Sequence, residues 1–575
     1  MQAHYLVTVK DPKNHLVSVT LNLKKDRERV EVFLPSWSPG SYLIREYARH
    51  IQNLRAEQQN GEILWCEQMD KGRFAIDFSK SDLNAPIQMG QDFSISYDVY
   101  CHEMTVRTSH IDESHAFLHG PSYLMGVAHA PLNSPTIEFR FPPLWSKLAT
   151  GLEDISPKRN VFLYRAKNYD ELLDSPVEIG CHESDGFATG GIPHHLNFYG
   201  PISSPLSTLK KDIKTIVETV SKTWGDIPYE QYVFITHSVP DLYGGLEHHN
   251  STVLHFDGTQ MNDREKYLGW LELVAHEYFH TWNVKRIRPV ELGPFDYERE
   301  NYTSMHWLTE GLTSFMDGLL VLRSGLMSLE EYLKKLAREI DALAQTPGRK
   351  FHSLEQSSFN AWIKLYRPDE NTQNSSVSYY LKGGLVFFAL QCMLAQKKRD
   401  MVDLLHLLWK RYKKDPDRGV LAHEVYEMIE SLGGPTIRES FETFVSTTRE
   451  IDFEAHLASI GLEVVRDEEV TPTLGARVKF NGDRVLIDRV ILDGPAYRAG
   501  LNGGDEILFV GGVRFLRKQW ERLSKTARVG EATSILLSRL GRPVEAQVIF
   551  EQGPQKIKEI LCRDRAKALK ILKGN

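Results

Sequence analysis

The stretch LVAHEYFHTWNVKR, residues 273–286, carries two histidines four positions apart, with a glutamate directly after the first. On a helical wheel, an apolar stripe runs along one side of this segment, and His276 and His280 fall on nearly the opposite side. Histidines at positions i and i+4 can direct their imidazoles at one point, which suits a tetrahedral zinc ion. Glu277 lies beside this point, where it can hold a water molecule and accept its proton. The alternative is an ordinary buried helix, since HExxH arises by chance in roughly a few per cent of chains this long.

A catalytic zinc ion needs a third protein ligand, for which several later side chains are candidates. We expect Glu310, in MHWLTEGLTSFMDGLLVL, because it opens a strongly apolar helix that would hold its carboxylate rigidly. Gly311 after it leaves room for another helix to approach closely. Asp317, further along the same helix, is either an acceptor for a ligand histidine or an ordinary surface acid. The other candidate ligands, most of them in a loop rich in proline, glycine and charge, are Glu291, Asp296, Glu298, Glu300 and His306.

The bulk composition is that of a globular protein with more than one domain. A chain of 575 residues is too long for one core and predicts about two to four domains. Its net charge of −7 gives no sign of a nucleic-acid partner. No basic and apolar leader and no apolar run of about 18 residues occurs, so we expect neither a signal peptide nor a membrane span. Five scattered cysteines without a CxxC pair indicate reduced thiols in a cytoplasmic protein.

The sequence pattern predicts a multidomain α+β fold. Residues 1–170 contain alternating stretches such as LVSVTLNL and FSISYDVY, separated by turn residues, which predict an all-β sandwich. Residues 171–455 mix a small sheet with many segments of helical spacing. Short strands with glycine turns over 456–555 predict one small domain, entered through a polar linker or strand-entry loop at 465–473. The tail, 556–575, is expected to be a basic, solvated terminal helix.

Several motifs together resemble the glycyl aminopeptidase family, whose members are PDZ-containing gluzincin zinc peptidases related to the aminopeptidase N family. HEYFH followed by WLTEG is similar to the gluzincin zinc motif. YGGLEHHN (243–250) resembles the G-x-M-E-N segment of the aminopeptidase N family, although His248 follows Glu247 here, and SYYLKGGLVFF (378–388) resembles its Y-x-K-G segment. HTWNVKR and SWSPGSYLIREYAR (36–49) are most similar to the glycyl aminopeptidases. The resemblance covers nearly the whole chain and implies a thermolysin-like, mostly α-helical catalytic domain after the β-sandwich.

This resemblance implies a zinc-dependent aminopeptidase that hydrolyses N-terminal residues, including small ones such as Gly or Ala, from peptide substrates. His276, His280 and Glu310 would be the zinc ligands. Glu277 would be the general base that activates water. The alternatives are a zinc endopeptidase and a PDZ adaptor whose peptidase body is inactive.

The resemblance also implies residues that position the substrate. Glu247 would bind the α-amino group of the peptide, beside Gly244 and Gly245, which allow a peptide backbone to approach closely. Tyr380 would donate a hydrogen bond to the oxyanion that forms during hydrolysis, with Tyr379 as its rival. In an endopeptidase, Glu247 would instead have a structural role.

The stretch ILDGPAYRAGLNGGDEILFVGGVRF (491–515) resembles a PDZ domain, because G-P-A, A-G-L and G-D-E-I-L occur in order. TLGARVKF (473–480) is similar to the loop that receives a peptide carboxylate and to the strand that follows it. RKQWERLSKT (517–526) would be the helix along the groove. The resemblance implies a peptide ligand that adds a strand to a sheet edge, and the alternative is a packing module that binds no ligand.

Overall fold

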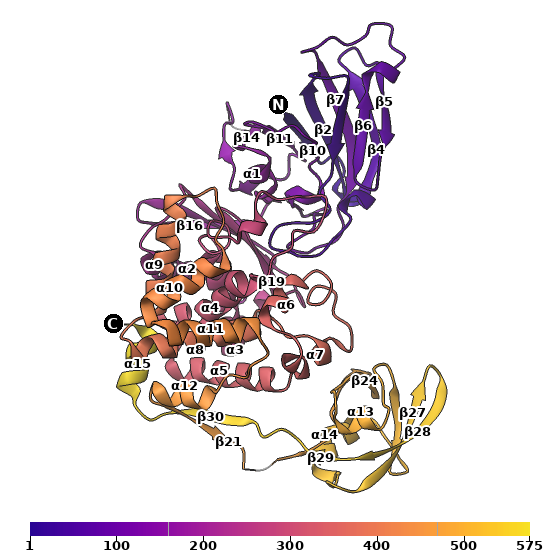
Figure 1. The fold of residues 1–575 in the computed structure, drawn as a ribbon. Coiled ribbons are helices and arrows are strands. Elements are labelled where there is room, and N and C mark those ends of the chain that lie inside the picture. The colour runs from indigo at the N-terminus through magenta and orange to yellow at the C-terminus, as the bar shows by residue number, and fades with distance from the viewer. Residues whose placement is uncertain (159, 469, 575) are drawn as a thin grey trace. The chain divides into compact units, whose positions relative to one another are not determined.

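A computed structural model describes residues 1–158, 160–468 and 470–574 (Figure 1). The chain divides into two compact units, of which the first comprises Met1–Tyr302 with Leu408–Val420 and the second Thr303–Leu407 with Leu421–Asn575. The prediction of a multidomain α+β chain, with a β-rich N-terminal part and a largely helical part after it, is confirmed. Every helix within the described residues is too short or too polar to cross a lipid bilayer.

The N-terminal part contains a large sheet with the strand order β10-β3-β6-β5-β4-β7-β2-β1-β11-β14-β13. Its strands are β1 (His4–Thr8), β2 (Leu16–Lys24), β3 (Arg29–Phe33), β4 (Ile51–Gln58), β5 (Ile63–Gln68), β6 (Arg73–Asp77), β7 (Asp92–Tyr100), β10 (Gly126–Val127), β11 (Thr136–Arg140), β13 (Glu153–Asp154) and β14 (Phe162–Arg165). Along β2 and β7 every second side chain is buried, as their alternating sequences predict. Their antiparallel pairing aligns Val19 with Tyr97 and so places both buried sets on one face.

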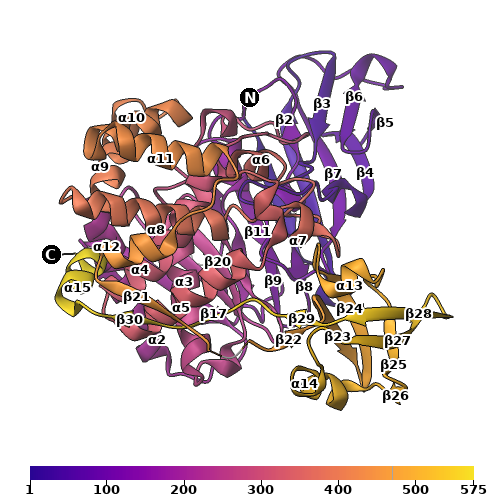
Figure 2. The same ribbon diagram turned by 60° about the horizontal axis from the view of Figure 1, so that its bottom comes forward.

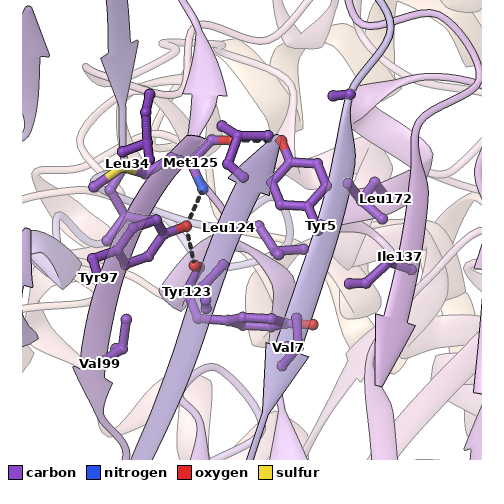
Figure 3. Packing of buried hydrophobic residues seen from close by; sticks show 14 of the residues in the cluster. Tyr5, Val7, Leu34, Tyr97, Val99, Tyr123, Leu124, Met125, Ile137 and Leu172 are labelled. Carbon is purple, nitrogen blue, oxygen red and sulfur yellow. Dashed lines mark hydrogen bonds between the residues drawn. The ribbon is translucent and has the colours of Figure 1, made fainter. Parts of the chain in front are cut away.

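Tyrosines in the core of this sheet satisfy backbone groups that would otherwise be buried without partners (Figure 3). The Tyr97 hydroxyl donates to the Tyr123 carbonyl at 2.8 Å and accepts from the Met125 amide at 3.1 Å. The Tyr5 hydroxyl donates to the Met125 carbonyl at 2.6 Å. These hydrogen bonds hold the irregular segment 123–125 against the sheet.

Two smaller sheets follow in the first unit. One has the order β12-β15-β9-β8 and the other β16-β17-β18-β20-β19. Their strands are β8 (His110–Ile111), β9 (His115–Leu118), β12 (Lys147–Thr150), β15 (Val177–Gly180), β16 (Glu183–Thr189), β17 (Ile192–Tyr199), β18 (Tyr232–Ser238), β19 (Gly244–Glu247) and β20 (Ser251–Phe256). β18 and β20 are buried along their whole length and run parallel, as strands covered on both faces do. β19 is antiparallel to β20 and forms the edge.

Among the described residues of the first unit, the α-helices that lie wholly within it are α1 (Tyr169–Leu173), α2 (Leu206–Trp224) and α3 (Arg264–Phe279). Asp263 is the N-cap of α3, and its side chain accepts hydrogen bonds from the first-turn amides of Glu265 and Lys266. It packs against α2, β19 and β20. Trp224 of α2 stacks on Trp282, with ring centroids 5.8 Å apart and planes 4° from parallel. These contacts set the C-terminal end of α3 beside the edge strand β19.

The second unit is built on helices, and Figure 2 shows α10 and α11 side by side. Its helices before the C-terminal sheets are α4 (Leu312–Arg323), α5 (Leu329–Ala344), α6 (Leu354–Phe359), α7 (Thr372–Ser375), α8 (Leu381–Gln396), α10 (Ala422–Gly433), α11 (Pro435–Ser446) and α12 (Phe453–Ser459). α9 (Met401–Lys414) begins in this unit and ends in the first. A π-helical turn, Trp307–Gly311, leads directly into α4. Such turns occur frequently at functional sites.

The last part of the second unit is a small antiparallel sheet with its own core. Its elements are β23 (Ala476–Asn481), β24 (Arg484–Val490), α13 (Pro495–Arg498), β25 (Glu506–Val510), β26 (Val513–Arg514), α14 (Arg517–Thr526), β27 (Ala532–Arg539) and β28 (Arg542–Ile549). The strands that flank it are β21 (Leu462–Arg466), β22 (Pro472–Thr473), β29 (Glu551–Gln552) and β30 (Ile557–Cys562), and the helix α15 (Arg565–Lys573) follows β30 and packs against α4 and α8. The ladders β21–β30 and β22–β29 lead the chain to this sheet and back. Glu469, inside the stretch interpreted as a linker or strand-entry loop, lies outside the described residues.

The terminal segment differs from the single helix expected over 556–575. Ile557–Cys562 pairs with β21 as strand β30, so the helix α15 begins only at Arg565. The helix is also packed rather than solvated throughout, because Ala568 and Leu572 are fully buried. Arg323 of α4 donates to the Leu572 carbonyl at 2.9 Å.

Candidate functional site

The two histidines of the HExxH motif lie one turn apart at the C-terminal end of α3. Their ring centroids are 4.7 Å apart, and the ring planes are 85° to one another. His280 forms the C-cap of the helix, and its Nδ1 lies 2.6 Å from the carbonyl oxygen of Asn283. A hydrogen bond of this kind fixes ring orientation and tautomer in metal-binding histidines. Sequence reasoning missed Asn283, because its contribution comes from the backbone.

Glu247, Glu277 and His280 converge within the first unit. One potential ligand atom of each lies within 4.8 Å of those of the other two, and all three side chains are buried. Glu277 comes from α3 and Glu247 from the end of the edge strand β19. The structure therefore brings together the predicted base, the predicted amine anchor and one predicted metal ligand.

Gly245 makes this convergence possible. A β-carbon at this position would lie 2.2 Å from Oε1 of Glu277, so a larger residue in β19 would displace the carboxylate. From the resemblance, both Gly244 and Gly245 are expected to give space to a peptide substrate. In the described structure, no atom lies within 4 Å of a β-carbon placed on Gly244, so there is open space beside this residue. The space beside Gly245 is occupied by the side chain of Glu277.

The N-terminal part of the chain supplies two contacts to this region that sequence reasoning did not identify. Gly40 has a φ of +80°, and a β-carbon there would lie 2.5 Å from Oε1 of Glu247. Arg107 donates from Nη2 to the Gly245 carbonyl at 3.2 Å. Gly40 lies inside the SWSPGSY turn, and that motif was the only sequence signal for this contact.

Asp174, at the C-terminal end of α1, contacts both the segment that follows Glu247, through His248 and His249, and the segment that follows α3, through Lys285. Its carboxylate lies 2.8 Å from Nζ of Lys285 and 3.0 Å from Nδ1 of His248, and it accepts from the His249 amide at 2.8 Å. Burial alone would raise the pKa of Asp174, but Lys285 and His248 outweigh this effect and hold the pKa well below its usual value. A cavity of about 360 Å³ opens here, and its walls include Glu247, His248 and Lys285.

Glu310 and Tyr380 meet within the second unit. Glu310 lies buried in the π-helical turn, and Tyr380 precedes α8, which packs against that turn. Burial and the nearby Glu310 both raise the pKa of Tyr380 above its usual value. The close approach depends on Gly311 and Gly383, because a β-carbon on Gly311 would lie 2.8 Å from the Gly383 Cα. The expectation that Gly311 allows close helix packing is confirmed.

Tyr379 and Tyr380 have different surroundings. Tyr379 is fully buried between the rings of His306 and Tyr380, at centroid distances of 5.1 and 4.8 Å. Tyr380 is only partly buried, and its hydroxyl lies 3.5 Å from that of Tyr366. Burial lowers the pKa of His306 to about 4 despite Glu310, which acts in the opposite direction.

Three of the acidic residues considered either as the third metal ligand or as an acceptor for a ligand histidine form ion pairs instead. Asp296 lies 2.7 Å from Arg299, and Glu298 lies 2.5 Å from Arg73. Asp317, considered as an acceptor for a ligand histidine, accepts from Lys335 at 3.1 Å.

Comparisons with known proteins agree with this fold and these motifs. A family profile described as M61 glycyl aminopeptidase matches residues 269–386, and one described as the peptidase M61 N-terminal domain matches residues 4–181. A solved structure from Idiomarina loihiensis, described as an aminopeptidase N family protein, is 28% identical, with a TM-score of 0.92 over 99% of this chain and 100% of that chain. A search of curated proteins finds no match.

Two further solved structures are more distant. An M1 zinc metallopeptidase from Deinococcus radiodurans is 14% identical, with a TM-score of 0.49 over 78% of this chain and 94% of that chain. The LTA4 hydrolase of yeast is 14% identical, with a TM-score of 0.48 over 79% of this chain and 68% of that chain.

The fold and the HExxH helix define a metallopeptidase. Zinc is the metal that fits its donor groups, because two imidazoles at i and i+4 and a carboxylate are typical zinc ligands. The chain belongs to the M61 glycyl aminopeptidase family, as its motifs predicted.

Proposed function

We propose that this protein is a zinc-dependent aminopeptidase that removes single residues from the N-terminus of peptides. The observation that carries the proposal is the convergence of Glu247, Glu277 and His280. An exopeptidase needs an anion at a fixed distance from the reacting carbonyl, so that only a chain end with a free ammonium group is positioned for attack. Glu247 supplies that anion next to the residue that activates water.

His276, His280 and Glu310 are the proposed zinc ligands. The crossed imidazole planes on α3 and the hydrogen bond from His280 to the Asn283 carbonyl support the first two. The burial of Glu310 in a helical turn, packed through Gly311 against α8, supports the third, since a rigid carboxylate can accept a metal without reorganisation. When bound, zinc supplies a Lewis acid that acidifies water and polarises the scissile carbonyl.

The remaining chemistry belongs to the protein's own side chains. Glu277 accepts a proton from the attacking water and later delivers it to the leaving amine. Tyr380 donates its hydroxyl hydrogen bond to the oxygen that gains negative charge. Tyr379 is the weaker candidate, since it is enclosed by His306 and Tyr380.

We propose peptides with small N-terminal residues, Gly or Ala, as the preferred substrates. The family description, glycyl aminopeptidase, supports this preference. The five cysteines, none of them paired, support a cytoplasmic location.

The experiment that tests the function compares chromogenic aminoacyl substrates with free and acetylated N-termini. An aminopeptidase releases the chromophore only from the free forms, because acetylation removes the charge that Glu247 binds. Equal cleavage of both forms would reject this proposal in favour of a zinc endopeptidase. A preparation that holds no zinc after metal loading would favour a binding protein with an inactive peptidase body.

For the C-terminal sheet, β23 to β28, we propose a PDZ-like role. Helix α14 spans Arg517–Thr526, the segment expected to border a peptide groove, and β23 is an edge strand of its sheet. An edge strand can receive an extended peptide as an additional strand. Titration with a labelled peptide library bearing free or amidated C-termini tests this role, since a carboxylate-binding groove requires the free form.

A further inference from the structure

A second group of potential metal ligands lies in the first unit, outside the HExxH motif. His110 of β8, His115 of β9 and Asp112 in the turn between them each offer one ligand atom, and the three atoms lie within 4.8 Å of one another. We propose that these three residues bind a second divalent transition-metal ion. Two imidazoles and one carboxylate suit zinc and its first-row neighbours, whereas magnesium and calcium prefer oxygen ligands alone.

The spacing of His110 and Asp112 fits two ligands of one ion. Nε2 of His110 lies 3.3 Å from Oδ2 of Asp112. Ligands at about 2.0–2.1 Å from a tetrahedral ion are about 3.3–3.4 Å apart. Nδ1 of His110 lies 2.7 Å from the His102 carbonyl, which can only accept a hydrogen bond, so Nδ1 carries the proton. Nε2 is therefore the His110 nitrogen that faces Oδ2 of Asp112.

His115 is oriented in the way that metal-binding histidines usually are. Its Nδ1 lies 2.8 Å from Oε1 of the buried Glu178, so it donates its hydrogen there and presents Nε2 as the ligand atom. The other carboxylate oxygen of Glu178 lies 2.9 Å from Nε2 of His237. Tyr199 stacks on His115 with centroids 3.5 Å apart, which holds the ring in place.

Asp112 is held in the same way through its second oxygen. Oδ1 accepts hydrogen bonds from the Ser114 amide at 2.7 Å and from the His115 amide at 3.2 Å, which leaves Oδ2 directed at His110. An ion can reach this carboxylate, because the Asp112 side chain is 34% exposed and that of His110 is 14% exposed.

This ion would join β8 to β9. Through His115 and Glu178 of β15 it would also be connected to His237 on β18, in the neighbouring sheet β16-β17-β18-β20-β19. His237 on β18 lies 3.0 Å from His255 on β20, so the hydrogen-bonded chain runs from the metal ligand His115 to the strand that pairs with β19. We therefore expect the second ion to stabilise the first unit rather than to take part in peptide hydrolysis.

Metal content of the full-length protein tests this inference. After loading with zinc and removal of free metal, we expect two zinc ions per wild-type chain and one in His110→Gln and in Asp112→Asn. Asn at position 112 can still accept the Ser114 and His115 bonds, so this variant should fold normally. The matched control is His102→Gln, which replaces an exposed neighbouring imidazole that is not one of the three ligands and keeps the backbone carbonyl near Nδ1 of His110, and it should keep two ions.

Variants of the HExxH motif separate this inference from the proposed function. His276→Gln should lose the ion of α3 and retain one, and zinc should still raise its Tm. Adding Asp112→Asn to that variant should abolish both the remaining ion and the Tm increase. One zinc ion per wild-type chain, or two ions in both His110→Gln and Asp112→Asn, would overturn the second site without affecting the first.

Discussion

The carboxylate of Glu277 lies so close to Gly245 that a β-carbon on that glycine would approach Oε1 to 2.2 Å. The edge strand β19 thus sets the position of a residue on α3, and both carry groups of the candidate site. A methyl group at position 245 would push the carboxylate away from the point where Glu247 and His280 meet.

We therefore expect Gly245→Ala to lower kcat by about 100-fold, since displacing a reacting group by about 1 Å has an effect of this size. Steady-state kinetics on a free aminoacyl substrate measure the change. Overpacking should also reduce the free energy of unfolding by about 1–3 kcal/mol.

Gly269→Ala is the matched control for this substitution. Gly269 also lies in α3, and a β-carbon there would have no atom within 4 Å in the described structure. We expect full activity and unchanged or slightly higher stability, because alanine favours helix more than glycine does. Equal kinetics for Gly245→Ala and Gly269→Ala would show that Gly245 does not position Glu277.

Glu277→Gln should keep the metal and lose turnover. The amide cannot accept a proton, and loss of a general base typically lowers rates by about 100- to 10,000-fold. Zinc content and kcat are measured on the same preparation. Turnover near that of the wild type would remove Glu277 from the role of base, whereas loss of zinc would indicate that Glu277 supports the metal site itself.

Local patterns in the sequence anticipated a large part of this structure. The alternation in LVSVTLNL and FSISYDVY predicted β2 and β7. The HExxH spacing placed two imidazoles on adjacent turns of α3. In each case the decisive interactions are between residues close together in the chain, so periodicity alone reveals them.

Contacts between distant segments were not predicted. Gly40 meets Glu247, and Arg107 donates to Gly245, across more than a hundred residues, and neither contact leaves a periodic signal. The strand at Ile557–Cys562 was taken for helix for the same reason, because its partner β21 lies almost a hundred residues earlier. The Asn283 carbonyl that orients His280 belongs to the backbone and has no sequence signature at all.

Glu247→Gln should discriminate between substrates with and without a charged N-terminus. The amide oxygen of glutamine can still accept from the ammonium group, but the negative charge is lost. Losing the charge assistance costs about 1–1.5 kcal/mol, or about a 5- to 13-fold decrease in kcat/KM for free aminoacyl substrates. The binding of a competitive inhibitor that lacks the amino group should change little. An equal loss for substrate and inhibitor would mean that Glu247 supports the site structurally, as in an endopeptidase.

Gly311→Ala should weaken metal binding by displacing the proposed ligand Glu310, which lies in the second unit. Its methyl group would meet the Gly383 Cα at 2.8 Å and so shift the π-helical turn that carries Glu310. We expect the zinc affinity to fall by about 10- to 100-fold, the range found when the support of a metal ligand is removed. Competition with a chelator measures it. Gly384→Ala is the control, since the nearest atom to its β-carbon would be at 3.5 Å, an ordinary contact.

Asp174 should make stability depend on pH in the acid range. Its folded-state pKa is held below the value of about 3.9 found in unfolded chains. Its stabilising effect is therefore complete above that value and is lost as the pH falls toward the folded-state pKa. At pH 7, Asp174→Asn should lower the free energy of unfolding by about 3–5 kcal/mol, since Lys285 and His248 would lose their charged partner.

Urea unfolding at pH 7, 5 and 3 measures this dependence. The difference between the wild type and Asp174→Asn should shrink as the pH approaches 3, because the carboxylate of the unfolded wild-type chain then takes up a proton while that of the folded chain stays charged. Asp26→Asn is the control, since Asp26 forms an exposed pair with Arg27 and such a change should alter stability by less than about 0.5 kcal/mol. A difference between the wild type and Asp174→Asn that stays constant over this range would show that the ion pair of Asp174 does not lower its pKa.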